Sequence, residues 1–160
     1  GEGVRAVALQ AAPLLAAWIR NHVTDPVVVG PDEESEQWVS GVAVGAGCGY
    51  VVLSKRRRGD REVRVEGSAA EACAGRTPVL VDDIISSGQT MAQTVRHCRA
   101  AGSAPPVCVG VHGVFAPDAF AALQQAGAAQ VVTTNSIPHA SNAIDLAPLL
   151  AGAVTRFWQR

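Results

Sequence analysis

The chain has 160 residues, with 13 Lys and Arg against 14 Asp and Glu, and its formal net charge is −1. That length suits one domain, and an apolar share of 48% is enough to fill a core, so the composition excludes a disordered chain. The balanced charge argues against a nucleic-acid-binding protein, and no apolar run is long enough to span a membrane.

Short apolar strands alternate with helical segments along the chain. The apolar pattern predicts helices at residues 13–23, 33–47, 90–101, 117–126 and 147–157, and strands at 26–30, 50–53, 78–81, 107–111 and 131–134. Residues 56–75 are polar and charged, which predicts a flexible hairpin excursion. This alternation indicates an α/β fold: a mainly parallel sheet with helices on both faces.

Cysteine usage and the N-terminus bear on the cellular compartment. Cys48, Cys73, Cys98 and Cys108 form no Cys-x-x-Cys pair, and no His stands at a zinc-like spacing from them. We interpret them as buried free thiols in a reducing compartment. Residues 1–5 lack the basic and then apolar layout of a secretory signal, so we expect a cytoplasmic protein.

The chemically richest segment follows the third predicted strand. Asp82 and Asp83 come directly after apolar residues, and Ser86, Ser87, Gly88, Gln89 and Thr90 then lead into a helix. Small residues let successive backbone amides converge on an anion, and a helix N-terminus adds partial positive charge. The segment therefore predicts a phosphate-binding loop behind an acidic pair. The plainer alternative is an ordinary capped helix after a strand.

This segment resembles a known family signature. Residues 79–90, VLVDDIISSGQT, are similar to the phosphoribosyl pyrophosphate signature of the type I phosphoribosyltransferase fold. In that family the acids hold the ribose hydroxyls and the loop holds the 5-phosphate. Residues 27–32 (VVVGPD), 53–57 (LSKRR) and 131–138 (VVTTNSIP) extend the resemblance to the ribose-phosphate diphosphokinases.

The resemblance implies an enzyme that transfers pyrophosphate from ATP to ribose 5-phosphate, giving phosphoribosyl pyrophosphate and AMP. It implies that Asp32 binds Mg²⁺ and that Lys55 is catalytic. Arg57, Asp82, Asp83 and the loop residues would hold ribose 5-phosphate, the loop residues being Ser86, Ser87, Gly88, Gln89 and Thr90. The 160 residues would then be one phosphoribosyltransferase-like domain, the C-terminal half of a two-domain homo-oligomeric enzyme whose other half binds ATP.

Lys55 is unusual in this composition. It is the only lysine in the chain, and it begins a run that holds six of the 13 basic residues between positions 55 and 64. A compact, rotatable cation beside a phosphoryl group stabilises charge that develops in the transition state, a task that the planar Arg side chain performs differently. A basic run that merely forms a solvated face is the alternative.

Two departures from the family pattern keep other functions open. Glu33 and Glu34 stand where the family often has Gly-Gly, and Ser86 stands where it often has an acid. One alternative is a phosphoribosyltransferase that joins the activated sugar to a base, which needs a base-recognising hood. The other is a non-catalytic regulatory relative that binds sugar phosphate. For His112 and His139, near strand ends, a structural or surface role is expected.

Overall fold

Strands and helices alternate throughout the computed structural model, which describes residues 6–31, 35–53 and 71–159. In chain order the elements are α1 (Ala12–His22), β1 (Pro26–Gly30), α2 (Glu36–Ala46), β2 (Gly49–Val52), β3 (Thr77–Ile85), α4 (Gln89–Ala100), β4 (Val107–Gly113), α5 (Ala119–Gln125), β5 (Gln130–Thr134), β6 (Asn142–Ile144) and α6 (Ala147–Trp158).

The six described strands form one sheet in the order β2-β1-β3-β4-β5-β6, and every neighbouring pair is parallel. The chain first moves outward from β1 to β2 and then returns to the other side of β1 to lay down β3. Strand order therefore reverses between β1 and β3. This topology confirms the predicted parallel α/β sheet.

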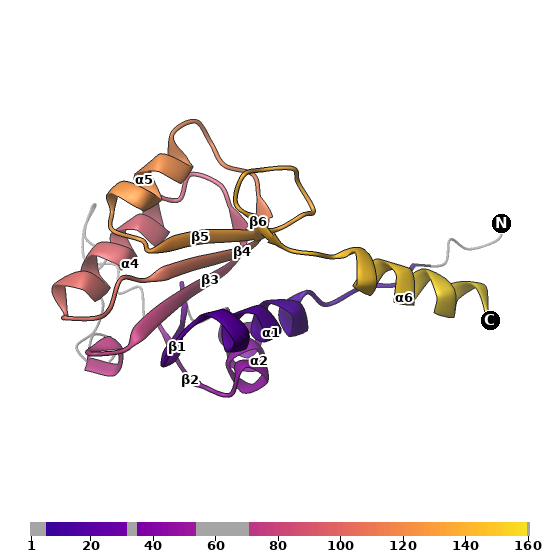
Figure 1. Cartoon of the computed structure of the whole chain (residues 1–160), viewed down its shortest axis with the longest axis horizontal. Helices are drawn as coiled ribbons and strands as arrows, with labels where there is room; N and C mark the ends of the chain where they lie inside the picture. The colour runs from indigo at the N-terminus through magenta and orange to yellow at the C-terminus, as the bar shows by residue number, and fades with distance from the viewer. Residues whose placement is uncertain (1–5, 32–34, 54–70, 160) are drawn as a thin grey trace.

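Helices cover both faces of the sheet, as Figure 1 shows. Side chains alternate between the faces along each strand. In β1, Val28 packs with residues of α1 and α2, whereas Val27 and Val29 pack with residues of α4 and α5. The uninterrupted apolar runs in the sequence follow from this arrangement, because a parallel strand with helices on both sides needs apolar residues at every position.

The structure corrects the predicted elements in three places. β6 was not predicted, and β3 continues to Ile85 rather than ending at Val81. Within the predicted excursion at residues 56–75, residues 71–73 form a helical turn, while residues 54–70 lie outside the described part. A strand of three residues has too little pattern to recognise, and β3 extends because its polar residues still pair with β4.

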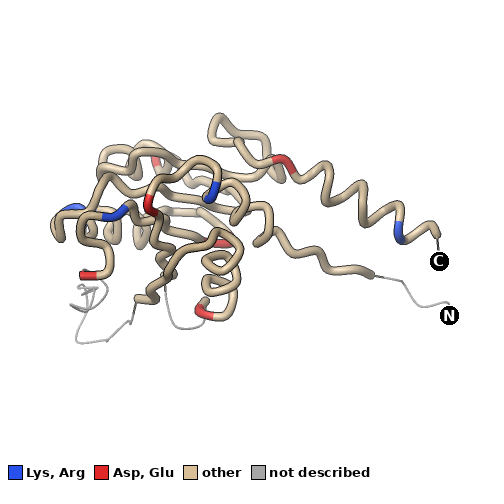
Figure 2. Tube along the Cα trace, turned by 60° about the horizontal axis from the view of Figure 1, so that its bottom comes forward, with Lys and Arg blue, Asp and Glu red and all other residues tan. Residues whose placement is uncertain are grey.

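The predicted closing helix forms as α6, but it packs differently from the other helices. No residue of α6 is buried, and Figure 1 shows the helix standing away from the sheet. Trp158, the last residue of α6, is 81% exposed. Figure 2 shows the described charged residues dispersed over the molecule. Among the described residues, no helix is long and apolar enough to cross a membrane.

Candidate functional site

β3 is longer than β1 and extends beyond it at the carboxyl edge of the sheet. This extension leaves an opening beside β3, past the last residue of β1. β1 pairs with β3 as far as Val29 opposite Leu80, whereas β3 pairs with β4 as far as Ile85 opposite Gly113. From Asp82 onward, β3 has a neighbour in β4 but no paired residue in the described part of β1. Strand order also reverses here, and ligands of open α/β sheets bind at such reversals.

A pocket that is partly open to solvent lies at this opening. Its walls come from the end of β1, from the middle of β3, from Leu53 after β2, and from the first two turns of α4. The walls are largely apolar, and Asp82, Thr90 and Thr94 add polar side chains. Apolar walls with a few converging polar groups are typical of small-molecule sites. The structure thus brings Asp82 and Thr90, two of the predicted site residues, to one pocket.

The two predicted acids have different surroundings. Asp82 is half-buried and lines the pocket, and its carboxylate Oδ1 accepts a hydrogen bond from the backbone amide of Asp83 at 2.9 Å. Asp83 is exposed. Consecutive strand residues point to opposite faces, so the pair does not share one position. Asp82 is therefore the acid placed to accept hydrogen bonds from a ligand in the pocket.

The loop after β3 requires a glycine at its last position. Gly88 has φ +66°, a left-handed conformation that side chains with a Cβ rarely adopt. A Cβ at this position would be in ordinary van der Waals contact with Leu123 and Ala119 of α5, at 3.5 and 3.6 Å, so the requirement for glycine comes from the backbone conformation. The carbonyl of Ser86 accepts a hydrogen bond from the amide of Ala116 at 3.1 Å. The loop is thus held against the segment that carries α5.

The first turn of α4 is open to an anion. Gly88 caps the helix without a side-chain hydrogen bond among the described residues, and the first turn contains no acidic residue. The first amides of any helix have no acceptor within that helix, and the helix dipole makes this end partly positive. Ser86, Ser87, Gln89 and Thr90 are all exposed beside it. The phosphate-binding role of this loop stays a prediction, and the exposed hydroxyls and amide are the groups that it would use.

Asp32, Lys55 and Arg57 lie outside the described residues, so their predicted roles stay predictions. The described residues nearest to them still carry information. Pro31, directly before Asp32, and Leu53, two positions before Lys55, both line the pocket.

The pocket offers a suitable but incomplete donor set for Mg²⁺. Over residues 6–31, 35–53 and 71–159, no three His, Cys, Asp or Glu side chains are grouped as metal ligands. Mg²⁺ prefers oxygen donors and is usually held by one or two carboxylates together with substrate phosphates and water. The Asp82 carboxylate in the pocket has the right chemistry for such a shared site.

Sequence reasoning missed the buried polar residue in the pocket wall. Thr94 is 4% exposed, and its hydroxyl donates to the carbonyl of Thr90 at 3.0 Å. Residues four positions apart share one face of a helix. The spacing from Thr90 to Thr94 is therefore the signal that could have identified this residue.

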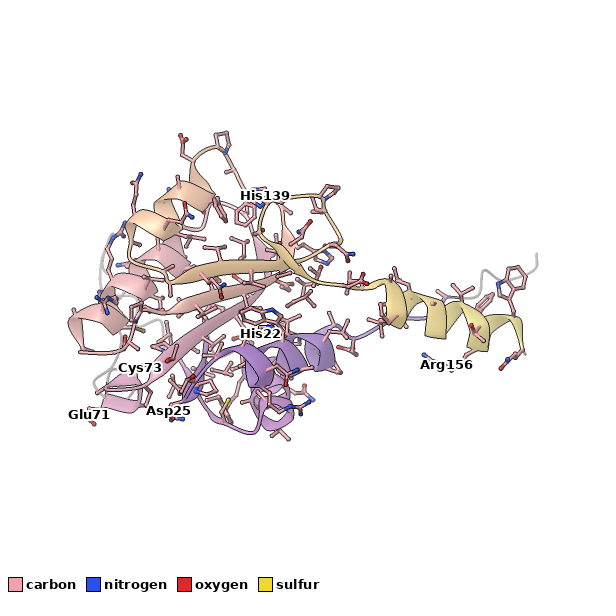
Figure 3. The ribbon with its side chains drawn as sticks, in the orientation of Figure 1. His22, Asp25, Glu71, Cys73, His139 and Arg156 are labelled. Atoms are coloured by element: carbon pink, nitrogen blue, oxygen red, sulfur yellow. The ribbon has the colours of Figure 1, made fainter. Side chains whose placement is uncertain are left out.

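The two histidines near strand ends have the structural contacts expected of them. Nδ1 of His112 lies 3.0 Å from Oγ of Ser136, which joins the ends of β4 and β5. Nδ1 of His139 lies 2.8 Å from Oγ of Ser141, and the imidazole ring packs on Phe115 and Phe120 (Figure 3). These contacts hold together the loops at the carboxyl edge of the sheet.

Comparison with known proteins agrees with this geometry. The family model described as "Phosphoribosyl transferase domain" matches residues 7–148. The chain is 34% identical over 152 residues to a ribose-phosphate pyrophosphokinase of Methanosarcina acetivorans, covering 94% of this chain and 53% of the relative. It is 33% identical over 135 residues to a ribose-phosphate pyrophosphokinase of Sulfolobus acidocaldarius, covering 84% of this chain and 46% of the relative.

Solved structures of similar proteins share this fold. The phosphoribosylpyrophosphate synthetase of Mycobacterium smegmatis superimposes with a TM-score of 0.78 at 29% identity, covering 93% of this chain and 51% of that one. The orotate phosphoribosyltransferase of Aeropyrum pernix gives a TM-score of 0.56 at 18% identity, covering 90% and 74%, and this likeness shows the fold alone. The chain spans about half the length of the pyrophosphokinases that it matches.

Proposed function

The chain belongs to the phosphoribosyl transferase domain family, and we propose that it is the ribose 5-phosphate-binding half of a ribose-phosphate pyrophosphokinase. The observation that carries the proposal is the pocket at the β1–β3 reversal, where Asp82 and the bare N-terminus of α4 meet. The likeness to named pyrophosphokinases along almost the whole chain supports this activity over others on the same fold.

In this proposal the sugar phosphate binds across the pocket. The 5-phosphate lies at the start of α4, where backbone amides and the hydroxyls of Ser86, Ser87 and Thr90 donate to its oxygens. Gly88 lets the loop turn, and Gln89 contributes the first amide of the helix. The carboxylate of Asp82 accepts hydrogen bonds from the ribose hydroxyls, and charged acceptors make such bonds strong. Asp83 and Arg57 belong to the same proposed binding set.

The proposed reaction moves a pyrophosphoryl group. The C1 hydroxyl oxygen of ribose 5-phosphate attacks the β-phosphorus of ATP and forms a new P–O bond. The bond from that phosphorus to the α,β-bridging oxygen breaks, AMP leaves with the electron pair, and the hydroxyl proton passes to solvent. Holding the sugar by both its phosphate and its hydroxyls orients C1 for this attack, which lowers the entropic part of the barrier.

Lys55 and Asp32 complete the proposed machinery. Lys55 supplies a compact positive charge to the oxygens of the transferring group, where negative charge develops. Asp32 holds Mg²⁺, which neutralises phosphate charge when it is bound. ATP as co-substrate, a homo-oligomeric assembly and a cytoplasmic location are parts of the same proposal.

The test separates binding from turnover. Titration calorimetry of the 160-residue chain with ribose 5-phosphate should show binding that inorganic phosphate competes away. AMP release from ATP and ribose 5-phosphate is then measured for the chain alone and for the chain joined to the unmatched portion of the Methanosarcina relative. AMP from the joined protein supports the proposal.

Two other results would overturn it. Pyrophosphate release from phosphoribosyl pyrophosphate and a purine or pyrimidine base, without any AMP, would make the chain a base phosphoribosyltransferase. Sugar-phosphate binding with neither reaction, even in the joined protein, would make it a non-catalytic regulatory relative.

The role of Lys55 has its own prediction. Lys55→Arg in the joined protein should lower kcat more than it raises KM, because the charge is kept while its compact geometry is lost. Steady-state kinetics with varied ribose 5-phosphate measures both constants. An unchanged kcat would remove Lys55 from the catalytic machinery.

A further inference from the structure

Two buried thiols touch each other at the end of the molecule away from the pocket. The Sγ atoms of Cys73 and Cys98 are 4.0 Å apart, and the two residues are 1% and 3% exposed. Cys73 lies in the helical turn before β3, and Cys98 lies in the last turn of α4. Figure 3 shows Cys73 and Glu71 near the beginning of β3, far from His139.

Backbone contacts already hold the two segments side by side. The amide of Gly75 donates to the carbonyl of Gly102 at 3.2 Å, and the amide of Ala104 donates to the carbonyl of Arg76 at 2.9 Å. Bonding between the sulfurs would therefore join two segments that are neighbours before any reaction.

The side chain of Arg76 fixes the same turn to β1. Its Nη2 donates to the carbonyl of Pro26 at 2.7 Å, and its Nε pairs with the carboxylate of Asp25 at 3.2 Å. The position of Cys73 opposite Cys98 is thus set by contacts from three parts of the chain.

The two sulfurs are not equivalent. The thiol of Cys98 donates a hydrogen bond to Sγ of Cys73, which lowers the pKa of Cys73, although burial opposes this effect. The pKa of Cys98 is raised, first by its bond to Cys73 and then by burial. Cys73 is therefore the sulfur that ionises first, and the thiolate is the reactive form of cysteine.

We propose that Cys73 and Cys98 are a peroxide-sensitive modification site that forms an intrachain disulfide. The thiolate of Cys73 attacks one oxygen of a peroxide, the O–O bond breaks, and hydroxide leaves, giving a sulfenic acid at Cys73. The sulfur of Cys98 then attacks the sulfur of this sulfenic acid. The S–S bond forms, the S–O bond breaks, and the oxygen leaves as water together with the thiol proton of Cys98. Two thiols lose two electrons and two protons, and one hydrogen peroxide becomes two waters.

Access to Cys73 comes from opening of its short turn. Glu71, Ala74 and Gly75 around Cys73 are exposed, so a local opening of this segment would bring peroxide to the Cys73 sulfur. Cys48 is half-buried in the cluster on the opposite face of the sheet. Cys108 shares a cluster with Cys73 and Cys98, but it is fully buried in β4 and has no exposed segment beside it comparable to the one around Cys73.

The proposed site is independent of the proposed function. Its disulfide would tie the end of α4 to the segment before β3, whereas the pocket is lined by the start of α4 and the middle of β3. It would close a loop of 25 residues in the unfolded chain, and such a loop restriction stabilises the folded state.

The experiment treats the folded 160-residue chain with hydrogen peroxide, alkylates the remaining thiols and maps the peptides by mass spectrometry. We expect a Cys73–Cys98 cross-linked peptide, a loss of two hydrogen masses, and a rise in Tm of roughly 5–10 °C that dithiothreitol reverses. Cys48→Ala and Cys108→Ala should keep all three results. Cys98→Ala should lose the cross-link.

Several results would overturn the proposal. These are a cross-link of Cys73 or Cys98 to Cys108, a sulfinic acid at Cys73 while Cys98 stays a thiol, or oxidation only after unfolding in urea. If Cys98→Ala does not fold, the peptide map of the unmutated chain decides alone. Ribose 5-phosphate titration of the oxidised chain keeps the two proposals apart, since its affinity should stay within twofold.

Discussion

α4 and α6 are helices of equal length, 12 residues each, but only α4 has buried residues. The sequence of α4, QTMAQTVRHCRA, is the more polar one, yet it buries five residues against the sheet and α5: Met91, Ala92, Thr94, Val95 and Cys98. The sequence of α6, APLLAGAVTRFW, is far more apolar and buries none. Apolar content thus does not by itself decide which helix enters the core.

Chain connectivity decides it instead. α4 links β3 to β4, two adjacent parallel strands, so the chain must cross back over one face of the sheet and the helix lies on that face. α6 follows β6, an edge strand, and no described strand comes after it. The crossover also explains the site, because it places the N-terminus of α4 at the carboxyl edge of β3.

A matched pair of valines tests the contrast between the helices most strongly. Val95 in α4 is fully buried, whereas Val154 in α6 is 53% exposed. Val95→Ala should lower the free energy of unfolding by about 2 kcal/mol, because it leaves a cavity. Val154→Ala should change it by less than about 0.5 kcal/mol. Urea unfolding of both variants measures the difference, and equal losses would mean that α6 is packed as α4 is.

The sequence predicted both helices but not this difference. The expected bounds of 90–101 and 147–157 each lie within one residue of the observed ends of α4 and α6. An apolar pattern shows which side of a helix seeks burial, but not whether a neighbour exists to receive it. The exposure of Trp158 is the clearest result of that limit.

The candidate site could be located from the sequence because acids and small residues after an apolar strand are a local pattern. The structure places Asp82 and Thr90 of that pattern in the pocket, and the phosphate-binding role of the loop from Ser86 to Thr90 stays a prediction. The separation of Asp82 from Asp83 depends on the pleat of a strand that runs farther than its apolar residues indicate. Thr94 enters the pocket only because α4 packs on the sheet against β3, and this packing cannot be read from the sequence around Thr94.

Two glycines at opposite ends of α4 sharpen the comparison within one helix. Gly88 and Gly102 have φ +66° and +83°, so replacing either with Ala should cost about 1–2 kcal/mol of stability. Gly102 has nothing within 4 Å of a built Cβ and lies away from the pocket. Gly88→Ala should also weaken ribose 5-phosphate binding severalfold, while Gly102→Ala should not. Calorimetry with chemical unfolding separates the effects, and equal affinities would remove the loop from the site.

Two acids, Asp82 in β3 and Glu71 in the segment before β3, test the chemistry of the pocket. Asp82→Asn should weaken ribose 5-phosphate binding about tenfold, or about 1.4 kcal/mol, because a neutral amide is a poorer acceptor for sugar hydroxyls. Glu71→Gln removes an exposed carboxylate near the beginning of β3 and should leave the affinity unchanged. If both variants bind ribose 5-phosphate with equally reduced affinity, the loss comes from the change in net charge and not from a contact between Asp82 and the sugar.

The stability of the cluster under α4 should depend on pH, because this cluster contains the buried thiol of Cys108. α6 contains no cysteine and should not contribute to this dependence. Burial raises the pKa of Cys108 from 9.0 to about 12, so the folded chain keeps a proton that the unfolded chain releases. The resulting stability is complete below pH 9 and is lost as pH rises toward 12, by about 1 kcal/mol between pH 9 and pH 10. Urea unfolding midpoints of the unmutated chain and of Cys108→Ala between pH 9 and pH 10 measure this loss of stability. The cavity in the variant lowers its midpoint at every pH, but its midpoint should fall less steeply as the pH rises. Parallel slopes would show that Cys108 is not the group that titrates, and that the alkaline loss comes from elsewhere in the core.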